Sequence, residues 1–376
     1  MDSPERYLEF MRLALEAARQ GRGAVEPNPL VGAVILDAEH RMVVTGWHER
    51  YGGPHAEIVA LQQAGERARG GTLIVTLEPC CHYGKTPPCT EAILAAGIRR
   101  VVAAMTDPFP AVAGQGLQRL RQAGVEVITG VAEVEARRLN AAYLKRLATG
   151  QPWVHAKWAM SLDGCLASSR GESRWISNVT SRRRVHQLRG TMDAIVIGGK
   201  TVLTDDPLLT VRPPGPRVPR RVVVSGRGQL PADAQLLRTA REVPTLLYTS
   251  PEALPHLSAW QAAGVEIVTL APHTPADSPD ARLSIPALLE DLGRRGCTHI
   301  LVEGGPTLLS AFWQAEAIDE WHVFLAPLLL ATGRLPLQGR AAQHMHDALR
   351  LAQVSVQVCD DNAYLHGYTP RGPFAA

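Results

Sequence analysis

Strand-like and helix-like segments alternate along the first part of the chain. The runs at residues 30–36 and 72–77 are predicted strands, and residues 3–20 and 88–96 are predicted helices, the first with Leu8, Met11, Leu15 and Ala18 on one face. Further strands are predicted at 42–46, 100–104 and 125–129, and further helices after His55, over 115–123 and over 133–149. Strands separated by helices of this length indicate a layered α/β sheet.

A turn sequence ends the last of these helices and divides the chain. The chain has 376 residues, and a single domain usually has roughly 150. Thr149-Gly150-Gln151-Pro152 breaks the helical pattern, so we place the boundary there, with domains at 1–148 and 149–376. The second part restarts with predicted strands at 153–160, 194–198, 221–225, 245–249, 265–270, 299–302, 320–326, 354–359 and 364–368. It is therefore predicted to be a second α/β domain.

Composition and net charge argue against nucleic acid and membranes as binding partners. The chain is 45% hydrophobic with a net charge of +3, which fits a packed protein and is too weak to indicate binding to nucleic acid or membrane. The N-terminal segment is amphipathic and carries acidic residues, unlike a signal peptide, and the apolar run at 323–331 is too short to span a membrane. We therefore expect a cytoplasmic protein with reduced cysteines that acts on small molecules.

Four residues of the first domain form a metal-binding pattern. His55, Cys80 and Cys89 offer one imidazole and two thiols, which suits tetrahedral zinc with a fourth position open to water. An open position is typical of a catalytic site. Glu57 follows His55 by two residues and need not be a ligand. We interpret Cys81 as a bystander, because no cysteine at ligand spacing pairs with it.

The chemistry expected of this pattern is hydrolytic deamination. Zinc lowers the pKa of its water to roughly 7, so that hydroxide can attack an amidine-like ring carbon. Glu57 would take the proton and deliver it to the leaving amine. Zinc nucleobase deaminases combine a His-x-Glu triplet with Pro-Cys-x-x-Cys. Here eight residues, rather than two, separate Cys80 from Cys89.

Two segments of the second domain run from an apolar strand into a glycine pair. They are residues 194–199 and 300–307. Such junctions let backbone N–H groups approach an anion at the start of a helix. Neither matches a complete G-x-G-x-x-G, so a dinucleotide site and a simple tight turn are both left open.

The chain resembles the RibD family of bifunctional riboflavin-biosynthesis deaminase/reductases, and the long Cys80-to-Cys89 insertion is a feature of that family. The segments that carry the resemblance are PNPLVG at 27–32, HAE at 55–57, TLEPCCHYGKTPPC at 76–89, KWAMSLDG at 157–164, GESRWI at 171–176, TVLTDDPLLT at 201–210 and VEGG at 302–305. The resemblance covers nearly the whole chain. It implies a cytidine-deaminase-like three-layer α/β/α domain followed by a dihydrofolate-reductase-like α/β domain.

The resemblance also implies roles for individual residues. Zinc ligands would be His55, Cys80 and Cys89, with Glu57 as proton shuttle. The deaminase substrate would contact Asn28, His48, His82 and Lys85. The cofactor NADPH would contact Ala159, Trp175, Thr201, Asp205, Gly305, Pro306, Thr307, Leu308, Leu309, Ser310 and Ala311. The reductase substrate would contact Lys157, Ser173, Arg189, Leu209, Arg212 and Glu303. Lysine and arginine at these positions suit a phosphate, which binds ammonium and guanidinium groups well.

The implied reactions are hydrolysis followed by reduction. The first would deaminate 2,5-diamino-6-ribosylamino-4(3H)-pyrimidinone 5′-phosphate, and the second would transfer hydride from NADPH to C1′ and open the ribose to a ribityl chain. Asp205 and Glu303 are both candidates for the reductase proton donor. Family members often carry a serine or threonine side chain where this chain has Gly226, so only backbone can reach the cofactor there.

Two other functions compete with this interpretation. One is a nucleic-acid-editing deaminase with an RNA-binding domain, against which the near-neutral charge and the single short basic run at 182–184 argue. The other is a protein whose second domain only binds nucleotide or mediates assembly. We expect small pyrimidine ribosyl phosphates as ligands, no nucleic-acid or membrane partner, and a possible homo-oligomer.

Overall fold

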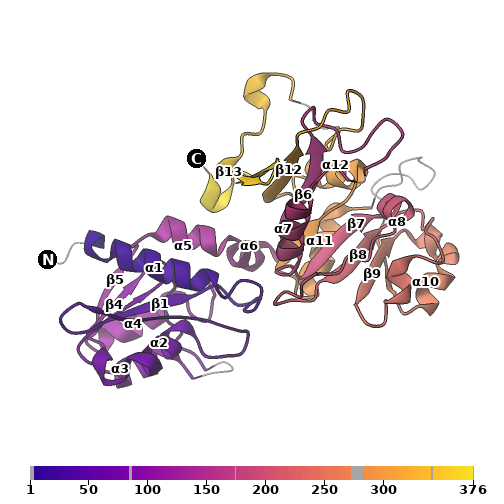
Figure 1. Ribbon diagram of the computed structural model, residues 1–376. Helices are drawn as coiled ribbons and strands as arrows, with labels where there is room; N and C mark the ends of the chain where they lie inside the picture. Colours follow the sequence, from indigo (N-terminus) through magenta and orange to yellow (C-terminus); the bar gives the residue numbers. More distant parts are fainter. Residues whose placement is uncertain (1–3, 84–86, 174, 272–282, 340–341, 376) are drawn as a thin grey trace. The chain divides into compact units, whose positions relative to one another are not determined.

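The computed structural model describes residues 4–83, 87–173, 175–271, 283–339 and 342–375. The chain divides into two compact units, Met1–Thr149 and Gly150–Ala376, coloured from indigo to magenta and from magenta to yellow in Figure 1. Among the described helices, none combines the length and the apolar character needed to cross a membrane.

The first unit is built on a five-stranded mixed sheet. Its strands are β1 (Gly32–Leu36), β2 (Met42–Trp47), β3 (Thr72–Val75), β4 (Arg100–Ala103) and β5 (Glu126–Thr129), in the order β2-β1-β3-β4-β5. β1 pairs antiparallel with β2 and β3, whereas β3, β4 and β5 run parallel. The parallel strands therefore end at one edge of the sheet.

Helices cover both faces of this sheet. They are η1 (Pro4–Tyr7), α1 (Leu8–Arg19), α2 (Ala56–Ala64), η2 (Gly65–Ala68), α3 (Cys89–Ala95), α4 (Gln115–Gln122), α5 (Glu133–Leu139) and α6 (Ala141–Thr149). Alternate residues of β1 point to opposite faces. Ala33 and Ile35 pack with α2, α3 and α4, while Val34 and Leu36 pack with α1 and α5. The predicted three-layer α/β/α arrangement is confirmed.

The second unit contains a nine-stranded sheet. The strands are β6 (Trp153–Ser161), β7 (Ala194–Gly198), β8 (Arg220–Val224), β9 (Thr245–Thr249), β10 (Glu266–Thr269), β11 (His299–Val302), β12 (Glu320–Ala326), β13 (Ala352–Cys359) and β14 (Asn362–Tyr368). Their order is β10-β9-β8-β7-β11-β6-β12-β14-β13. The strands from β10 to β12 are parallel, and β14 and β13 add an antiparallel end.

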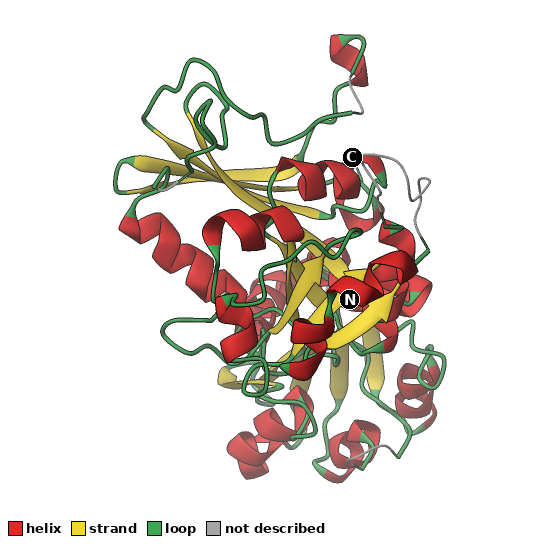
Figure 2. Ribbon diagram, turned by 90° about the vertical axis from the view of Figure 1, so that its right-hand side faces the viewer, coloured by secondary structure: helices red, strands yellow, loops and turns green. Residues whose placement is uncertain are grey.

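Helices also lie on both faces of the second sheet (Figure 2). They are α7 (Val179–Arg189), α8 (Gly199–Asp205), α9 (Gln235–Arg238), η3 (Pro251–His256), α10 (Ser258–Ala262), α11 (Ile285–Arg294), α12 (Pro306–Gln314), η4 (Met345–Asp347) and η5 (Gly372–Phe374). Helices α11 and α12 pack on one face, and α8, α9 and α10 pack on the other. This is the α/β fold predicted for the second half.

One predicted helix is interrupted. The expected helix at 133–149 is divided into α5 and α6 at Asn140, whose buried side chain bonds to backbone rather than to solvent. Asn140 Oδ1 accepts from Leu30 N–H at 2.8 Å, and Asn140 Nδ2 donates to the Leu30 carbonyl at 3.0 Å. Asparagine competes with helical hydrogen bonding in this way, and here it anchors the segment that enters β1.

We predict that Asn140→Leu destabilises the first unit by about 2–4 kcal/mol, because it leaves two buried backbone groups of Leu30 without partners. Urea denaturation should show a lower midpoint, and hydrogen exchange should speed up around Leu30. Gln122→Leu, an exposed polar-to-leucine change on α4, is the matched control. Equal midpoints for the two variants would contradict this account of Asn140.

Candidate active sites

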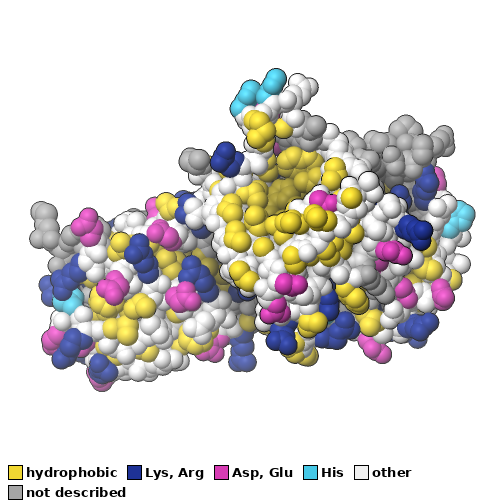
Figure 3. All heavy atoms as spheres, turned by 45° about the horizontal axis from the view of Figure 1, so that its top comes forward, with side chains coloured by type: hydrophobic (Ala, Val, Ile, Leu, Met, Phe, Trp, Pro, Cys, Tyr) yellow, Lys and Arg dark blue, Asp and Glu magenta, His cyan; other side chains and the backbone are white. Residues whose placement is uncertain are grey.

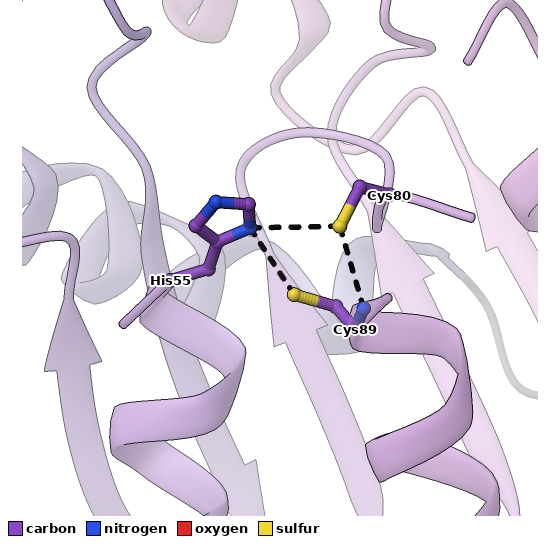
Figure 4. A group of neighbouring side chains, drawn as sticks. All are labelled: His55, Cys80 and Cys89. Carbon is purple, nitrogen blue, oxygen red and sulfur yellow. Dashed lines mark hydrogen bonds between the residues drawn. The ribbon is translucent and has the colours of Figure 1, made fainter. Parts of the chain in front are cut away.

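Three potential metal ligands converge in the first unit (Figure 4). His55 is the N-cap of α2, Cys89 is the first residue of α3, and Cys80 lies in the loop that follows β3. His55 Nδ1 lies 3.6 Å from Cys80 Sγ and 3.3 Å from Cys89 Sγ. The three ligand atoms all lie within 4.8 Å of one another, so one ion could contact all three.

The donor set fits zinc. The Cys89 backbone N–H, at the start of α3, donates to Cys80 Sγ at 3.3 Å, and such a donor favours a thiolate. A hydrogen bond between the two thiols lowers the pKa of Cys80 to about 4 and raises the pKa of Cys89. The pair therefore holds a proton that zinc would displace on binding. Cys81 lies outside this group and contacts the Ala111 carbonyl instead.

Glu57 lies beside the three ligands but is not one of them. It is the second residue of α2 and follows His55, the N-cap of that helix, by two residues. Its side chain is almost completely buried. Burial raises the pKa of the Glu57 carboxyl above its ordinary value. A raised pKa suits a group that must both accept and release a proton near neutral pH.

A cavity of about 360 Å³ lies beside the candidate ligands, and His55 and Cys80 form part of its wall. Its walls bring together every predicted deaminase residue in the described part of the chain except Cys89, which is completely buried. Lys85 lies outside the described residues. The lining residues are Pro27, Asn28, Pro29, Val31, His48, Tyr51, Gly52, Gly53, His55, Glu57, Leu77, Glu78, Cys80, His82, Asp107, Phe109, Val112, Tyr143, Arg146 and Leu147.

Hydrogen bonds orient the polar groups of the cavity wall. His48 Nδ1 lies 2.9 Å from the Pro54 carbonyl and must therefore carry the proton. His48 Nε2 can then accept from Asn28 Nδ2 at 3.2 Å, which leaves Asn28 Oδ1 as an acceptor for a ligand. Burial lowers the pKa of His48, which favours this neutral form. His82 Nδ1 is also buried and has no hydrogen-bond partner among the described residues.

A buried carboxylate shapes the loop that carries Cys80. Glu78 Oε1 accepts from the backbone N–H groups of Gly116 and Leu117, at 2.9 and 3.2 Å. Glu78 Oε2 accepts from those of Asp107 and Gly114, at 3.1 and 2.9 Å. Glu78 thus connects the segment after β3 to the start of α4, two residues before the candidate zinc ligand Cys80.

Sequence reasoning missed several residues of this cavity. Asp107 Oδ1 accepts from the Tyr143 hydroxyl at 3.0 Å, and burial raises the pKa of Asp107. Arg146, one turn further along α6, brings a positive charge to the wall. The signal that could have found Asp107 is its place just after β4, since neighbouring parallel strands β3 and β4 end at the same edge.

The second unit brings three predicted reductase residues together. Glu303, just after β11, receives two hydrogen bonds from Arg189, at 2.6 and 3.0 Å. Lys157 Nζ, on β6, lies 3.5 Å from Glu303 Oε2. The carboxylate is 6% exposed, and although burial opposes ionisation, the two cations lower its pKa to about 2. Glu303 is therefore ionised at neutral pH and orients cations rather than donating a proton.

Lys157 and Arg189 respond differently to this environment. Burial outweighs the attraction of Glu303 and lowers the pKa of Lys157, whereas the Glu303 carboxylate keeps the pKa of Arg189 raised despite burial. Arg189 also donates to the Thr210 carbonyl at 3.3 Å. The Thr210 hydroxyl accepts from Arg212 at 3.2 Å, so Arg212 belongs to the same neighbourhood. Leu209 is buried and has a positive φ of 53°.

The predicted cofactor residues occupy two strand-to-helix junctions. Gly305 is the N-cap of α12, and a Cβ on it would lie 3.9 Å from Thr201 Oγ1 on α8. The two junctions therefore approach each other, as expected where parallel strands β7 and β11 pair. Leu308, Leu309 and Ser310 are buried, and both leucines pack in the core, so their side chains face away from solvent.

The remaining predicted reductase residues lie further along α8 and α12 or on other segments of the second unit. Pro306 and Thr307 form the first turn of α12, Ala311 is half-buried further along it, and Asp205 ends α8. Ala159 lies two residues after Lys157 on β6 and so shares its face of the sheet. Ser173 is half-buried, while Trp175 is 70% exposed with Arg182 over its ring at 4.5 Å. The Gly226 carbonyl accepts from Ser250 N–H.

Comparison with known proteins identifies both units. Residues 4–105 match the family described as cytidine and deoxycytidylate deaminase zinc-binding region, and residues 152–365 match the RibD C-terminal domain. The riboflavin biosynthesis protein RibD of Aquifex aeolicus is 39% identical, covering 93% of this chain and 94% of its own. The RibD protein of Escherichia coli is 40% identical, covering 86% of this chain and 88% of its own.

Solved structures show the same similarity in three dimensions. Acinetobacter baumannii RibD superposes with a TM-score of 0.84 at 36% identity, over 98% of this chain and all of the other. A Thermotoga maritima diaminohydroxyphosphoribosylaminopyrimidine deaminase/5-amino-6-(5-phosphoribosylamino)uracil reductase superposes with a TM-score of 0.81 at 33% identity, over 97% of this chain and 99% of the other. The similarity therefore extends through both units.

We predict that the Glu303 carboxylate makes stability fall in acid. Its folded pKa of about 2 lies below its ordinary value near 4.5, so the stabilisation is present above about pH 4.5 and is lost as pH falls toward 2. The full effect is about 3 kcal/mol. Denaturation of the wild type should show this loss, and Glu303→Gln should show a flatter dependence. The exposed Glu290→Gln serves as control, and parallel curves for wild type and Glu303→Gln would refute a depressed pKa.

Proposed function

The chain belongs to the RibD family of riboflavin biosynthesis proteins, and we propose that its two reactions are divided between residues 1–148 and 149–376. The first part deaminates 2,5-diamino-6-ribosylamino-4(3H)-pyrimidinone 5′-phosphate with zinc. The second part reduces the ribosyl group of 5-amino-6-(5-phosphoribosylamino)uracil to ribityl with NADPH. The observation that carries this proposal is the convergence of His55, Cys80 and Cys89 beside the buried Glu57, at the wall of one cavity that His55, Cys80 and Glu57 line.

In the deaminase, His55, Cys80 and Cys89 would hold zinc, and Glu57 would move the protons. Zinc supplies a Lewis acid that makes water nucleophilic near neutral pH. Glu57 takes a proton from the attacking water and delivers it to the departing amino group, so that water and the amine give a carbonyl and ammonia. The raised pKa of Glu57 allows both transfers. The orientation of Asn28 by His48 supports a role for its Oδ1 in accepting an N–H of the pyrimidine.

The substrate phosphate requires a cation near the cavity. Arg146 lines the cavity wall, and its guanidinium can pair with two phosphate oxygens at once. Lys85 belongs to the segment outside the described residues and stays a candidate from the sequence. His82 lines the same cavity, which supports its assignment as a substrate contact. We therefore assign phosphate binding to Arg146 together with Lys85.

In the reductase, NADPH supplies the hydride, and the paired junctions at Thr201 and Gly305 would hold it. The assigned cofactor contacts are Ala159, Trp175, Thr201, Asp205, Gly305, Pro306, Thr307, Leu308, Leu309, Ser310 and Ala311. Because Leu308 and Leu309 face the core, they would contribute backbone only. The remaining assigned substrate contacts are Ser173, Leu209 and Arg212. Glu303 orients Arg189 toward the substrate phosphate, and Lys157, whose pKa is lowered, is a better proton donor than the ionised Glu303.

We also propose that the chain acts in the cytoplasm as a homo-oligomer. All six cysteines are free thiols, as the Cys80 and Cys89 roles require, and a reducing compartment keeps them so. Strand β13 is an edge of the nine-stranded sheet and exposes Val354, Val356 and Val358 by 50%, 63% and 82%. Figure 3 shows further hydrophobic side chains gathered around a hollow on one face. An exposed apolar edge strand favours pairing with a second copy.

We predict that Val356→Glu combined with Val358→Glu lowers the mass of the oligomer measured by light scattering, because the introduced charges would be buried at the β13 edge. Leu254→Glu, an equally drastic change at an exposed leucine of η3, should leave the mass unchanged. A wild-type chain that is monomeric at micromolar concentration would disprove the proposal.

We predict that Glu57→Gln slows ammonia release from the pyrimidine phosphate by at least about 100-fold while bound zinc is retained, because the amide cannot shuttle protons. Ammonia release and zinc content are measured together on the full chain. Glu66→Gln, at an exposed glutamate of η2, is the matched control and should keep full activity. Ammonia release from single-stranded RNA by the wild type would instead favour the editing-deaminase alternative.

The reductase in the same Glu57→Gln protein should oxidise NADPH at the wild-type rate when it is given the deaminated intermediate. Lys157→Met should have the reverse effect, with normal ammonia release and slowed NADPH oxidation, because it removes the cation beside Glu303. Loss of both activities in either variant would contradict two independent sites. Failure of the wild type to oxidise NADPH would mean that the second unit only binds nucleotide or mediates assembly.

A further inference from the structure

A second group of metal-binding side chains lies in the sheet of the second unit. His155 is on β6, and Glu320 and His322 are on the adjacent parallel strand β12. Glu320 is the register partner of His155, and His322 follows two residues later. Since alternate residues of a strand share a face, all three side chains project from the same side of the sheet. None of these residues belongs to either active site described above.

The spacing of the donor atoms matches a metal site. His155 Nδ1 lies 3.0 Å from His322 Nε2 and 3.3 Å from Glu320 Oε2. His322 Nε2 lies 3.4 Å from Glu320 Oε1. A tetrahedral zinc ion with bonds of roughly 2.0–2.1 Å separates neighbouring ligand atoms by about 3.3 Å. These atoms therefore need little rearrangement to surround one ion.

Outer partners support each ligand. The second nitrogen of His155, Nε2, lies 3.0 Å from His299 Nδ1, and that of His322, Nδ1, lies 2.7 Å from the Tyr364 hydroxyl. Each ligand nitrogen can thus be unprotonated while the other ring nitrogen donates outward. Metal-bound histidines are typically oriented by such a hydrogen bond. Only the proton shared between His155 Nδ1 and His322 Nε2 would be displaced.

The carboxylate is supported in the same way. Trp153 Nε1 donates to Glu320 Oε2 at 2.9 Å, and His366 Nε2 lies 2.7 Å from Glu320 Oε1. Glu320 is buried, and a carboxylate that is ionised in the protein interior is stable only beside positive charge. A divalent ion held between Glu320 and the two imidazoles would supply that charge.

We propose that His155, Glu320 and His322 form a second metal site that binds zinc or a similar divalent transition-metal ion. Two imidazoles and one carboxylate favour zinc, cobalt, nickel or copper over magnesium or calcium, which prefer oxygen ligands. The ion would link β6 to β12 and so stabilise the sheet beside the reductase residue Lys157, two residues beyond His155. The partly exposed His366 marks the side from which an ion could enter. The site is independent of the proposed deaminase and reductase activities.

The experiment counts metal ions on the untagged full chain. The protein is stripped with a chelator, loaded with cobalt(II), dialysed and analysed for bound cobalt per chain. The wild type should hold two ions, of which one gives a thiolate-to-cobalt charge-transfer band. The variant Cys80→Ser combined with Cys89→Ser should lose that band and keep one ion. Glu320→Gln combined with His322→Gln should keep the band and also hold one ion.

His256→Gln, at an exposed histidine of η3, is the control and should hold two ions. The cysteine variant keeps the proposal testable even if substitutions in the buried cluster unfold the second unit, because it leaves that cluster intact. One cobalt ion in the wild type, or none in the cysteine variant, would overturn the second site. So would two ions in a folded Glu320→Gln, His322→Gln chain.

Discussion

The carboxyl ends of parallel strands must meet at one edge of a sheet, and both active sites are built on that constraint. In the first unit β3 and β4 end together, which brings Cys80 and Asp107 to the same cavity. In the second unit β7 and β11 end together, which places Thr201 near Gly305 and sets Glu303 at the strand end. Helices begin close to these strand ends and offer unpaired backbone N–H groups there, as the bond from the Cys89 N–H to Cys80 Sγ shows.

Buried charge is compensated in three different ways in this molecule. Glu78 is held by four backbone N–H groups, so it fixes the loop that carries Cys80. Glu303 is held by Arg189 and Lys157, and its carboxylate in turn orients these two cations. Glu320 accepts from the Trp153 indole and bonds to His366, and its carboxylate also faces the imidazoles of His155 and His322. An imidazole nitrogen can give up its proton and bind a metal ion instead, which neither an amide N–H nor a guanidinium does.

Predictions from sequence succeeded where a local pattern was enough. The alternation of strands and helices indicated the layers, but the break between α5 and α6 depends on Asn140 reaching Leu30, which is 110 residues away. The contacts of Glu78 with distant backbone N–H groups and the position of Arg146 at the cavity wall were likewise missed. Neither residue belongs to a sequence motif whose spacing indicates such a position. The pairing of His155 with His322 joins residues 167 apart, and a pattern search has no means of relating them.

The kinds of chemistry available to the chain follow from its amino-acid sequence. Imidazole, thiol and carboxyl groups have intrinsic ligand and proton affinities, so the types and spacing of His55, Cys80, Cys89 and Glu57 are enough to indicate zinc-dependent deamination. Which groups share a cavity, which tautomer His48 adopts and why Glu303 is ionised depend instead on the tertiary structure. Distances, burial and neighbouring charges arise from strand register and packing between distant segments, and these quantities set the pKa values and the ligand geometry.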